Sequence, residues 1–528
     1  MTLQTIPILI VGAGPTGLNL ANLLSSYGIA YRLIEHKTET LHTSNALAIQ
    51  PRSLEMWDSM SLAENALARG KKILGISLNS ATKLIGQINL ATTGMETPFP
   101  FILGLPQSES ETLLTENLIK NGGKIERGCA LLDVMLTEKM VRAQLQHANG
   151  EIETVICDWL VAADGSHSTI RKNLNLDFIG ATIPEKFIMM DAEISADLNP
   201  DFFHAIFSPL GPLVFAPLRH FTRIICTVTH DTGIHDFKNP VISDFEYVIK
   251  KRSHIPVKII KSLWLSHFIT HHRLIGNYRQ GRILFAGDSA HIHSPVGGQG
   301  MNTGMQDTFN LAWKLALICK NKSGSKLLDT YNIERRNVAK KVLAGTTIMT
   351  RLVALKNPSL ISLRNYILSF ILQIKLLKKA FATRISEIGI KYPSNRSIIN
   401  NGKRAPDVLL LDSMSQAIHL RKLLHRLKHN ILIFTGKNVS DELIKKIIAL
   451  DSWINKMPND LFEIIIISAT RQNFSNKVVY FDEFLIAHKT YSLMQGGICL
   501  IRPDQYIGLS QTQINHYKIE EYVLAISQ

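Results

Sequence analysis

Residues 6–35 read IPILIVGAGPTGLNLANLLSSYGIAYRLIE, and this stretch decides the fold of the first part of the chain. An apolar run over residues 6–11 has the composition of a buried parallel strand, and a segment with helical periodicity follows the glycine turn. Gly28 is placed to end that helix in a left-handed conformation. A second apolar strand over residues 30–34 leads to Glu35. The pattern predicts a Rossmann-type unit of strand, glycine turn, helix and strand.

The glycine turn of this unit has the residues that a dinucleotide requires. Gly12 permits the tight turn, Gly14 lets the backbone approach a pyrophosphate, and Gly17 lets the helix and strand pack closely. The helix N-terminus attracts phosphates, and Glu35 can accept hydrogen bonds from ribose hydroxyls. The alternative is an ordinary glycine-rich turn between a strand and a helix. The complete unit favours a dinucleotide site.

A second constellation of the same kind lies more than two hundred residues further along. The apolar strand 283–286 ends in Gly287 and Asp288, and a loop with Pro295 and three glycines leads into a helix from about Gly304 to Cys319. The acid could hold a polyol, and the exposed N–H groups could hold an electron-rich ring edge. Two such sites predict one long cofactor that is contacted at both ends, as FAD would be; two unrelated turns are the alternative.

The rest of the chain extends this nucleotide fold. Residues 180–270 alternate in polarity and predict an antiparallel sheet inserted into it, while residues 72–103 are also strand-like. Residues 345–400 are helical and basic. A turn-rich boundary near residue 401 is followed by a new α/β pattern whose final strand is expected over residues 497–502.

Composition indicates a globular chain with a strongly basic balance. The 528 residues are 45% hydrophobic, and 58 Lys and Arg against 43 Asp and Glu give a net charge of +15. That excess raises the question of nucleic acid or an acidic membrane surface. Residues 351–391 carry eight of the positive charges and one negative charge, without a basic-aromatic nucleic-acid module. This segment is either a membrane-surface helix or, the favoured reading, a helix packed on a domain with its basic face in water.

The five cysteines are spread along the chain without a CxxC pair, which predicts a reduced, cytoplasmic protein with no cysteine-based metal site. The first residues lack the charged region of a signal peptide. No uninterrupted apolar run reaches the length of a spanning helix, so we expect no integral membrane segment.

Three segments together resemble a known family. They are residues 12–17 (GAGPTG) with Glu35, residues 163–171 (ADGSHSTIR) and residues 287–302 (GDSAHIHSPVGGQGMN). They are similar to the three fingerprints of single-component FAD-dependent aromatic hydroxylases of the para-hydroxybenzoate hydroxylase type. Residues 402–408 and 502–506 resemble the C-terminal domain of the branch that contains phenol, hydroxyphenylpropionate and polyketide or rifampicin monooxygenases.

The resemblance implies an α/β fold with a Rossmann-like FAD-binding domain, an inserted antiparallel-sheet substrate domain, a helical connector and a thioredoxin-like C-terminal domain. Because this chain lacks a CxxC pair, we expect the last of these to share only the shape of thioredoxin. The implied segments are 1–180 (FAD-binding domain, with substrate-domain strands at about 72–103), 181–275 (substrate-binding sheet), 276–345 (FAD-binding domain continued), 346–400 (connector) and 401–528 (C-terminal domain).

The resemblance also implies a set of cofactor-binding residues. The glycine turn would hold the pyrophosphate of FAD and Glu35 its ribose, while Asp288 would bind the ribityl or pyrophosphate region. Pro295 would lie over the isoalloxazine ring. The implied residues are Gly12, Gly14, Pro15, Gly17, Glu35, Gln107, Asp164, Gly165, Gly287, Asp288, Pro295, Gly298, Gln299, Gly300, Met301 and Asn302. The backbone amides of the last three would face the pyrimidine edge of the flavin, and Asp164 and Gly165 would also lie near the nicotinamide donor.

One position departs from the family pattern. Asn45 stands where the family usually has a basic residue, and Arg52 is a candidate substitute for that charge.

The implied activity is a monooxygenase that uses FAD, NADH or NADPH, and dioxygen to hydroxylate a phenolic, aromatic or polyketide-like substrate through a flavin C4a-hydroperoxide. No metal is required, because the flavin supplies the chemistry. No catalytic base is identified; His291 and His293 are more often structural hydrogen-bonding residues in such positions. A non-oxygenating FAD oxidoreductase on the same fold and a non-catalytic flavin or ligand binder are the alternatives. We expect a monomer or a homodimer, and no nucleic-acid partner.

Overall fold

The computed structural model describes most of the chain in two compact units. The described residues are 5–40, 46–228, 234, 236–294, 297–353, 355, 357–393, 402–457, 460–471 and 478–527. The first unit comprises Met1–Asn22, Tyr31–Thr308 and Ala339–Ile388, and the second comprises Leu23–Ala30, Phe309–Val338 and Gly389–Gln528. Asn45 and Pro295, both named in the predictions above, lie outside the described residues.

The first unit is built on a mainly parallel sheet. In spatial order its strands are β17 (Arg279–Gln280), β18 (Ile283–Phe285), β11 (Ile152–Ala162), β1 (Thr5–Val11), β2 (Arg32–Glu35) and β8 (Glu126–Arg127), with β10 (Val141–His147) and β9 (Cys129–Leu136) extending from β11. The four central strands β18, β11, β1 and β2 run parallel to one another. The segments of these strands that pair across the sheet centre, 9–11, 33–34, 160–162 and 283–285, are apolar and buried because both faces of a parallel sheet are covered. Gly28 has a φ of +66° just after the first helix, as predicted for a helix-ending glycine.

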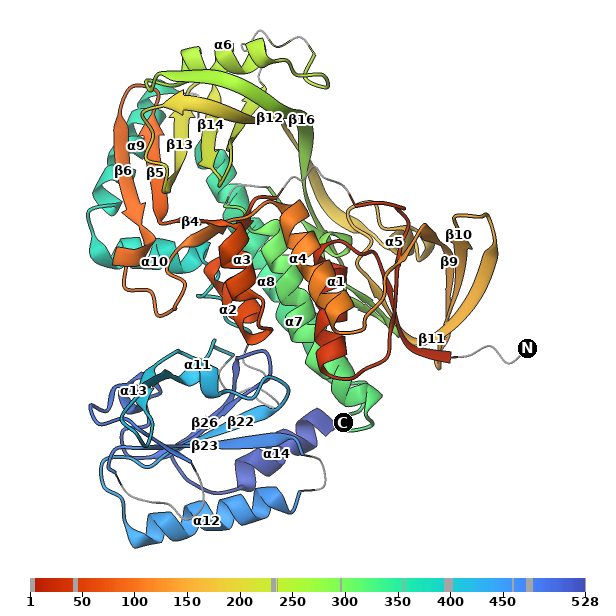
Figure 1. The fold of residues 1–528 in the computed structure, drawn as a ribbon, viewed down its shortest axis with the longest axis vertical. Helices are drawn as coiled ribbons and strands as arrows, with labels where there is room; N and C mark the ends of the chain where they lie inside the picture. The colour runs from red at the N-terminus through yellow and green to blue at the C-terminus, as the bar shows by residue number, and fades with distance from the viewer. Residues whose placement is uncertain are drawn as a thin grey trace. The chain divides into compact units, whose positions relative to one another are not determined.

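A second sheet in the same unit is formed largely by the inserted segment. Its strands are β19 (His291–Ile292), β16 (Val257–Ile275), β12 (Phe178–Ala196), β15 (Thr222–Val228), β14 (Gly211–Pro217), β13 (Phe202–Ser208), β5 (Gly75–Ser80) and β6 (Leu84–Asn89). All neighbours pair antiparallel except β13 and β5, which are parallel. The helix α6 (Ile242–Arg252) packs Phe245, Val248 and Ile249 on one face of this sheet (Figure 1). The expected antiparallel sheet is therefore confirmed, with one parallel pairing that the polarity pattern did not reveal.

Helices and a small sheet complete the first unit. The small sheet consists of β3 (Ala48–Ile49), β7 (Ile102–Gly104) and β4 (Lys71–Ile73). The helices that lie wholly or partly in this unit are α1 (Pro15–Ser26), α2 (Pro51–Ser59), α3 (Ala63–Arg69), α4 (Gln107–Lys120), α5 (Thr169–Asn173), α6, α7 (Gly300–Cys319), α8 (Leu327–Val353), α9 (Pro358–Ile371) and α10 (Lys375–Ile385). The predicted boundary at 345/346 falls inside α8, which is one continuous helix, and the five-segment division stays a prediction.

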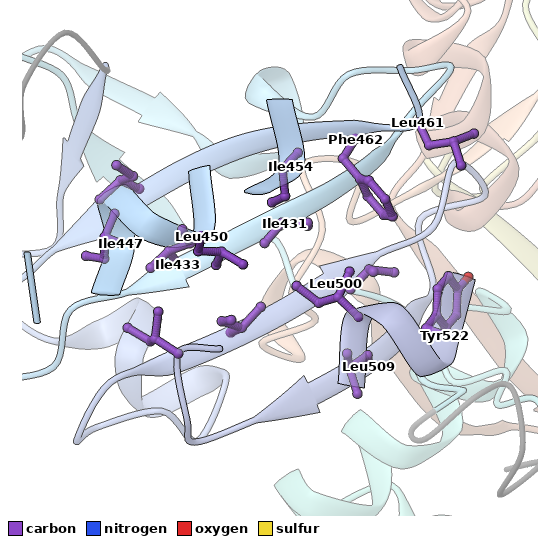
Figure 2. Packing of buried hydrophobic residues seen from close by; sticks show 14 of the residues in the cluster. Ile431, Ile433, Ile447, Leu450, Ile454, Leu461, Phe462, Leu500, Leu509 and Tyr522 are labelled. Carbon is purple, nitrogen blue, oxygen red and sulfur yellow. The ribbon is translucent and has the colours of Figure 1, made fainter. Parts of the chain in front are cut away.

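The second unit has its own sheet and core. Its strands are β21 (Ala417–His419), β20 (Leu409–Leu411), β24 (Val479–Phe481), β23 (Phe462–Ser468), β22 (His429–Phe434), β25 (Gly497–Ile501) and β26 (Ile507–Gln511), and its short helices are α11 (Leu420–Leu423) and α13 (Ile486–Thr490). Figure 2 shows Ile447, Leu450 and Ile454 of α12 (Asp441–Asn455) turned toward the sheet, and Tyr522 of α14 (Tyr517–Ser527) in the same core. The mixed α/β fold is confirmed; the thioredoxin likeness of this unit stays a prediction.

The end of the chain contradicts one expectation. Residues 497–502 do not form the last strand, because β26 pairs antiparallel with β25 and α14 follows it. The chain reverses through a tight turn in which Gln505 has a φ of +63°. The glycine that marks many such turns is absent here, and the turn was missed for that reason.

Candidate cofactor site

The predicted site residues come just after the carboxyl ends of four neighbouring parallel strands, and these strand ends are in register with one another. Val11 of β1 is in register with Ile34 of β2 on one side and with Ala162 of β11 on the other. Ala162 is in turn in register with Phe285 of β18. The residues that follow these strand ends are those of the fingerprints, namely Glu35, Gly12, Asp164 and Gly287. Ligands of open parallel sheets bind at the carboxyl ends of the strands, so segments far apart in sequence form one candidate site.

Three glycines of the site are required by close packing. A Cβ on Gly12 would lie 2.4 Å from the Ala163 carbonyl oxygen, and one on Gly17 would lie 1.9 Å from the Gly12 carbonyl oxygen. Gly287 has a φ of +62°, and its Cβ would lie 2.5 Å from Thr16 Oγ1. Only glycine therefore allows the backbone at these positions to lie as close as it does to Ala163, to Gly12 and to Thr16.

Gly14 differs from the other glycines of the turn. A Cβ on Gly14 would meet no heavy atom within 4 Å, and its backbone is not in the left-handed region. Nothing in the described protein therefore requires a glycine at this position. It lies directly before α1, whose first N–H groups lack partners within the helix. An open glycine beside a helix N-terminus suits the approach of a phosphate.

Glu35 holds the glycine turn from the end of β2. Its carboxylate is buried and accepts hydrogen bonds from the backbone N–H groups of Ala13, at 2.8 Å, and Lys37, at 3.0 Å. Part of its accepting capacity is therefore used inside the protein. The predicted ribose contact remains compatible with this geometry, because a carboxylate can accept several hydrogen bonds.

Asp164 follows β11 and has one oxygen without a partner. Its Oδ2 accepts from the backbone N–H of Thr169 at 2.8 Å, whereas the buried Oδ1 has no hydrogen-bond partner among the described residues. Burial raises the pKa of this carboxyl group. Gly165 has a φ of +77°, and a Cβ there would meet nothing within 4 Å. This strand end thus combines an unsatisfied polar atom with an open backbone.

Arg171 joins the second fingerprint to the third. Its Nη2 donates to the Ser166 carbonyl oxygen at 2.7 Å and its Nη1 donates to the Ser289 carbonyl oxygen at 3.1 Å. The guanidinium also lies 3.9 Å from the centre of the Phe178 ring. Burial lowers the pKa of Arg171. The arginine of the second fingerprint therefore has a structural role between two loops.

Asp288 lies in a short turn, η3 (Gly287–Ser289), after β18. Its side chain is exposed to solvent, yet desolvation by the surrounding protein raises the pKa of its carboxyl group. Its carboxylate makes no hydrogen bond or ion pair with any described residue. An accessible carboxylate without partners at a strand end is suited to polyol hydroxyls.

The third fingerprint leads into α7, which begins at Gly300. Gly298 is exposed, and Gln299 and Met301 are half-buried. The first hydrogen bond of the helix is donated by the Thr303 N–H to the Gln299 carbonyl oxygen. The amides of Gly300, Met301 and Asn302 belong to the first turn and lack intrahelical acceptors. They are placed to donate to an electron-rich edge.

The side chain of Asn302 is engaged within the protein. Its Nδ2 donates to the carbonyl oxygens of Ala48 and Gly298, both at 2.9 Å, and its Oδ1 accepts from the Gln50 N–H at 2.9 Å. Asn302 thereby fastens the loop to β3. Only its backbone amide is left for a ligand.

The two histidines of the third fingerprint have different partners, and in each the second ring nitrogen is buried without a partner among the described residues. Nε2 of His291 lies 2.8 Å from Asp307 Oδ2, which also accepts from the Gly287 N–H. Nδ1 of His293 lies 3.0 Å from the Ser294 carbonyl oxygen, so Nδ1 carries the proton and Nε2 is a bare acceptor. This Nε2 is buried without a partner among the described residues and would lie 3.9 Å from a Cβ on Gly300. Burial lowers the pKa of His293 to about 4.

Two further predictions meet different geometry. Gln107 begins α4, and its Nε2 donates to Glu111 Oε1 at 2.8 Å, so its predicted contact with the cofactor stays a prediction. Arg52 was suggested as a substitute for the basic residue missing at Asn45. That suggestion is wrong, because Arg52 is fully buried in α2 and pairs with Glu55 at 3.0 Å.

Some residues that shape the site were not identified from the sequence. Asp307 on α7 links Gly287 to His291, and Gln50 also donates from its Nε2 to the Gly297 carbonyl oxygen at 2.9 Å. The only sequence signal for Asp307 is its helical position one turn or more after the glycine loop. Its partners come from separate segments, so the pairing required the fold.

Neither a cluster of metal ligands nor a single membrane-spanning helix is formed by the described residues. No group of three or more His, Cys, Asp or Glu side chains is arranged to hold a metal ion in the described part of the chain. Within the same residues no single helix is long and apolar enough to cross a membrane; α9 and α10 meet the length and composition requirement only together, bent by 103°.

Comparison with known proteins places these features in context. Residues 5–346 match the model of the FAD binding domain family. The chain is 35% identical over 378 residues to 6-methylpretetramide 4-monooxygenase of Streptomyces rimosus, covering 72% of this chain and 68% of that protein.

Two solved structures share the fold over nearly the whole chain. The OxyS anhydrotetracycline hydroxylase from Streptomyces rimosus is 25% identical with a TM-score of 0.77, covering 99% of each chain. A ternary complex of aklavinone-11 hydroxylase with FAD and aklavinone is 19% identical with a TM-score of 0.78, covering 100% of each chain.

Proposed function

This chain belongs to the family of FAD-dependent aromatic hydroxylases, and we propose that it hydroxylates a phenolic, aromatic or polyketide-like substrate. The observation that carries the proposal is the row of strand ends at β2, β1, β11 and β18, which brings all three fingerprints to one edge of one sheet. The sheet edge alone is compatible with many nucleotide enzymes. The family membership selects oxygen insertion among them.

The chain's own residues suit the parts of FAD. The open backbone at Gly14 and the start of α1 would receive the pyrophosphate, and the accessible carboxylate of Asp288 would accept hydrogen bonds from the ribityl chain. The first amides of α7, at Gly300 to Asn302, would donate to the pyrimidine edge. When bound, FAD would take electrons from NADH or NADPH and activate dioxygen for transfer to the substrate ring.

We assign to His293 the role of accepting a hydrogen bond from the substrate hydroxyl. Its Nε2 is a buried acceptor beside Gly300 and has no partner among the described residues. Because the hydrogen bond to Ser294 fixes the proton on Nδ1, Nε2 is ready to accept. Drawing the proton from a phenol or enol makes the ring more electron-rich, which favours attack on an electrophilic oxygen.

The remaining elements of the proposal rest on the family likeness. The substrate would lie between the cofactor and the sheet that contains β12 to β16. The relatives described above are named for 6-methylpretetramide and anhydrotetracycline, which makes aromatic polyketides the first compounds to try. We further propose that the chain works in the cytoplasm, as a monomer or a homodimer.

The proposal is tested with the purified, FAD-loaded protein and a panel of simple phenols and aromatic polyketides. We expect one class to accelerate NADH or NADPH oxidation and to gain one oxygen atom from isotopically labelled dioxygen. Faster NAD(P)H oxidation without any oxygenated product would support a non-oxygenating oxidoreductase instead. A protein that cannot be loaded with FAD would contradict both enzyme hypotheses.

The assignment of His293 has a separate test. His293→Asn keeps a polar group near Nδ1 but removes the Nε2 acceptor, whereas His293→Gln can place an oxygen near Nε2. We expect both variants to bind FAD, with hydroxylation reduced about a hundredfold in the first and partly restored in the second, within the range typical of acid–base groups. Equal loss in both variants, with unchanged dependence on substrate pKa, would contradict the assignment.

A further inference from the structure

The helix α9 is apolar on two opposite faces. Its inner face lies against β6 of the second sheet, where Ile361 is buried and Leu368 packs on the same core as Leu372, which follows the helix (Figure 1). Its outer face carries a second apolar stripe at the spacing of three and four residues that keeps side chains on one side of a helix. The residues of this stripe are Leu360, Leu363, Ile367 and Phe370.

The outer stripe has no cover in the described protein. Phe370 is 58% exposed and Leu363 is 55% exposed, and the neighbouring Tyr366 is 74% exposed. A surface helix of a globular protein normally turns charged or polar residues outward. The favoured reading of the sequence, that the apolar residues of this segment pack on the domain and leave a basic face in water, is therefore wrong for half of α9.

The helix α10 continues the exposed apolar surface after the bend. Leu376 is 75% exposed and Leu377 is 38% exposed at its start. Neither α9 nor α10 is long enough to cross a bilayer by itself, so the lengths of these helices do not favour a membrane-spanning role. We call the exposed side chains Leu360, Leu363, Ile367, Phe370 and Leu376 the α9–α10 face.

Charge distinguishes among the partners that could cover this face. Residues 357–386 contain five Lys or Arg and no Asp or Glu. Arg364 is buried under the helix, but Lys375 is exposed and Lys378 is half-buried at the start of α10. Lys379 lies 3.7 Å from the exposed Glu96, which neutralises only one of these cations.

We propose that the α9–α10 face lies on an anionic lipid surface, with the two helices in the plane of the interface and the apolar side chains entering it. A symmetric contact with a second copy would cover the apolar stripe but would bring the same lysines together without carboxylates to pair them. An anionic bilayer satisfies both features, since it accepts apolar side chains and attracts cations. The inference concerns a surface outside the cofactor site and does not depend on the proposed reaction.

The test measures binding of the FAD-loaded protein to lipid vesicles by co-sedimentation. We expect binding to vesicles that contain phosphatidylglycerol, little binding to vesicles of phosphatidylcholine alone, and weakening at high salt. The double variant Leu363→Ser with Phe370→Ser should abolish binding. Ile260→Ser is the matched control, because Ile260 on β16 is 62% exposed and lies outside the face; it should bind like the unaltered protein.

A second variant tests the charges. Lys375→Gln with Lys378→Gln should weaken binding by about fivefold for each lysine, since each cation near an anionic surface contributes about that factor. Absence of binding to anionic vesicles would overturn the proposal. So would a dimer in sedimentation velocity that the Leu363→Ser and Phe370→Ser changes dissociate, because a second copy would then be the partner.

Discussion

Two regions differ in how their buried polar groups are paired. We call the carboxyl ends of β2, β1, β11 and β18 in the first unit the cofactor edge, and the buried side chains Lys314, Glu334, Arg502 and Asp504 of the second unit the ion cluster. At the cofactor edge, the buried atoms Asp164 Oδ1 and His293 Nε2 have no hydrogen-bond partner among the described residues. In the second unit, Glu334 accepts from Arg502 at 2.6 Å and 3.0 Å and from Lys314 at 2.9 Å.

The pKa values follow the same division. Burial alone would raise the pKa of the Glu334 carboxyl, but the charges of Arg502 and Lys314 hold it at about 2. Arg502 also donates to Asp504 Oδ1 at 2.9 Å, so the cluster balances its charges internally. At the cofactor edge burial raises the pKa of Asp164, and the hydrogen bonds from Ser168 and from backbone N–H groups offset only part of that rise.

This difference separates a binding site from a structural cluster. Buried polar groups in native proteins are almost always hydrogen-bonded, so an unpaired group requires an explanation. At the cofactor edge, where the unpaired groups also meet an open backbone, we expect a ligand to supply the missing partners. The ion cluster requires no ligand, because its members pair with one another. Strongly shifted pKa values often mark active sites, but here they result from the pairing of buried charges.

The largest effect is expected from breaking the cluster. Glu334→Gln leaves two buried cations, Arg502 and Lys314, with Asp504 as the one remaining carboxylate of the cluster, and breaking such a buried pair typically costs about 3–5 kcal/mol. The free energy of unfolding, measured by denaturant titration, should fall by that amount. Because the folded-state pKa of Glu334 is depressed, its stabilisation is present above the ordinary pKa of 4.5 and is lost as the pH falls toward 2.

A variant with unchanged stability would show that the cluster is as dispensable as an exposed ion pair. The claim that the ion cluster stabilises the fold would then be wrong. Lys428→Gln serves as the control, since its pair with Asp460 is exposed and contributes at most about 1 kcal/mol.

A smaller effect concerns the buried His429 of the second unit. Its Nε2 lies 3.0 Å from the Tyr522 hydroxyl oxygen, and burial lowers its pKa to about 3. The unfolded chain binds the proton at the ordinary pKa of 6.5, so the unfolding free energy falls as the pH drops below 6.5, by about 2 kcal/mol at pH 5. His429→Phe, which fits among the surrounding aromatic rings, should remove that part of the pH dependence of the thermal midpoint. An unchanged pH profile would mean that other groups cause it.

The smallest effect is expected at Asp288. Its raised pKa means that the carboxylate opposes folding above its ordinary pKa, so Asp288→Asn should raise the thermal midpoint of the FAD-free protein slightly at neutral pH. The same change should weaken FAD binding about tenfold, as expected for the loss of one hydrogen bond to a charged group. Calorimetry and flavin fluorescence measure the two effects. A lower midpoint with unchanged FAD affinity would place Asp288 among the structural residues.

The sequence was most informative where structure and chemistry are both local. The glycine turn at residues 12–17 and the strand that ends at Glu35 could be predicted because each glycine acts within a few residues of its own position. The same holds for β18 and the turn at Asp288. Spacing alone could also place these segments at the ends of parallel strands.

Tertiary partners were beyond that reasoning. The pairing of Arg52 with Glu55, the attachment of Asn302 to β3 and the contact between Asp307 and His291 depend on which segments the fold brings together. The exposure of α9 was misjudged for the same reason, since periodicity shows that a face is apolar and not whether anything covers it.

The central claim is that the open glycine of the first fingerprint faces the phosphates of FAD, and Gly14→Ala tests it most directly. Neither strain nor a close contact opposes a methyl group there, and Gly276→Ala is the matched control because Gly276 is equally open and lies outside the fingerprints. The measurement is the FAD dissociation constant of both variants, alongside the thermal midpoint without FAD. We predict unchanged midpoints, an unchanged dissociation constant for Gly276→Ala, and one raised about a hundredfold or more, some 2.7 kcal/mol, for Gly14→Ala. Equal FAD affinity in the two variants would contradict the account.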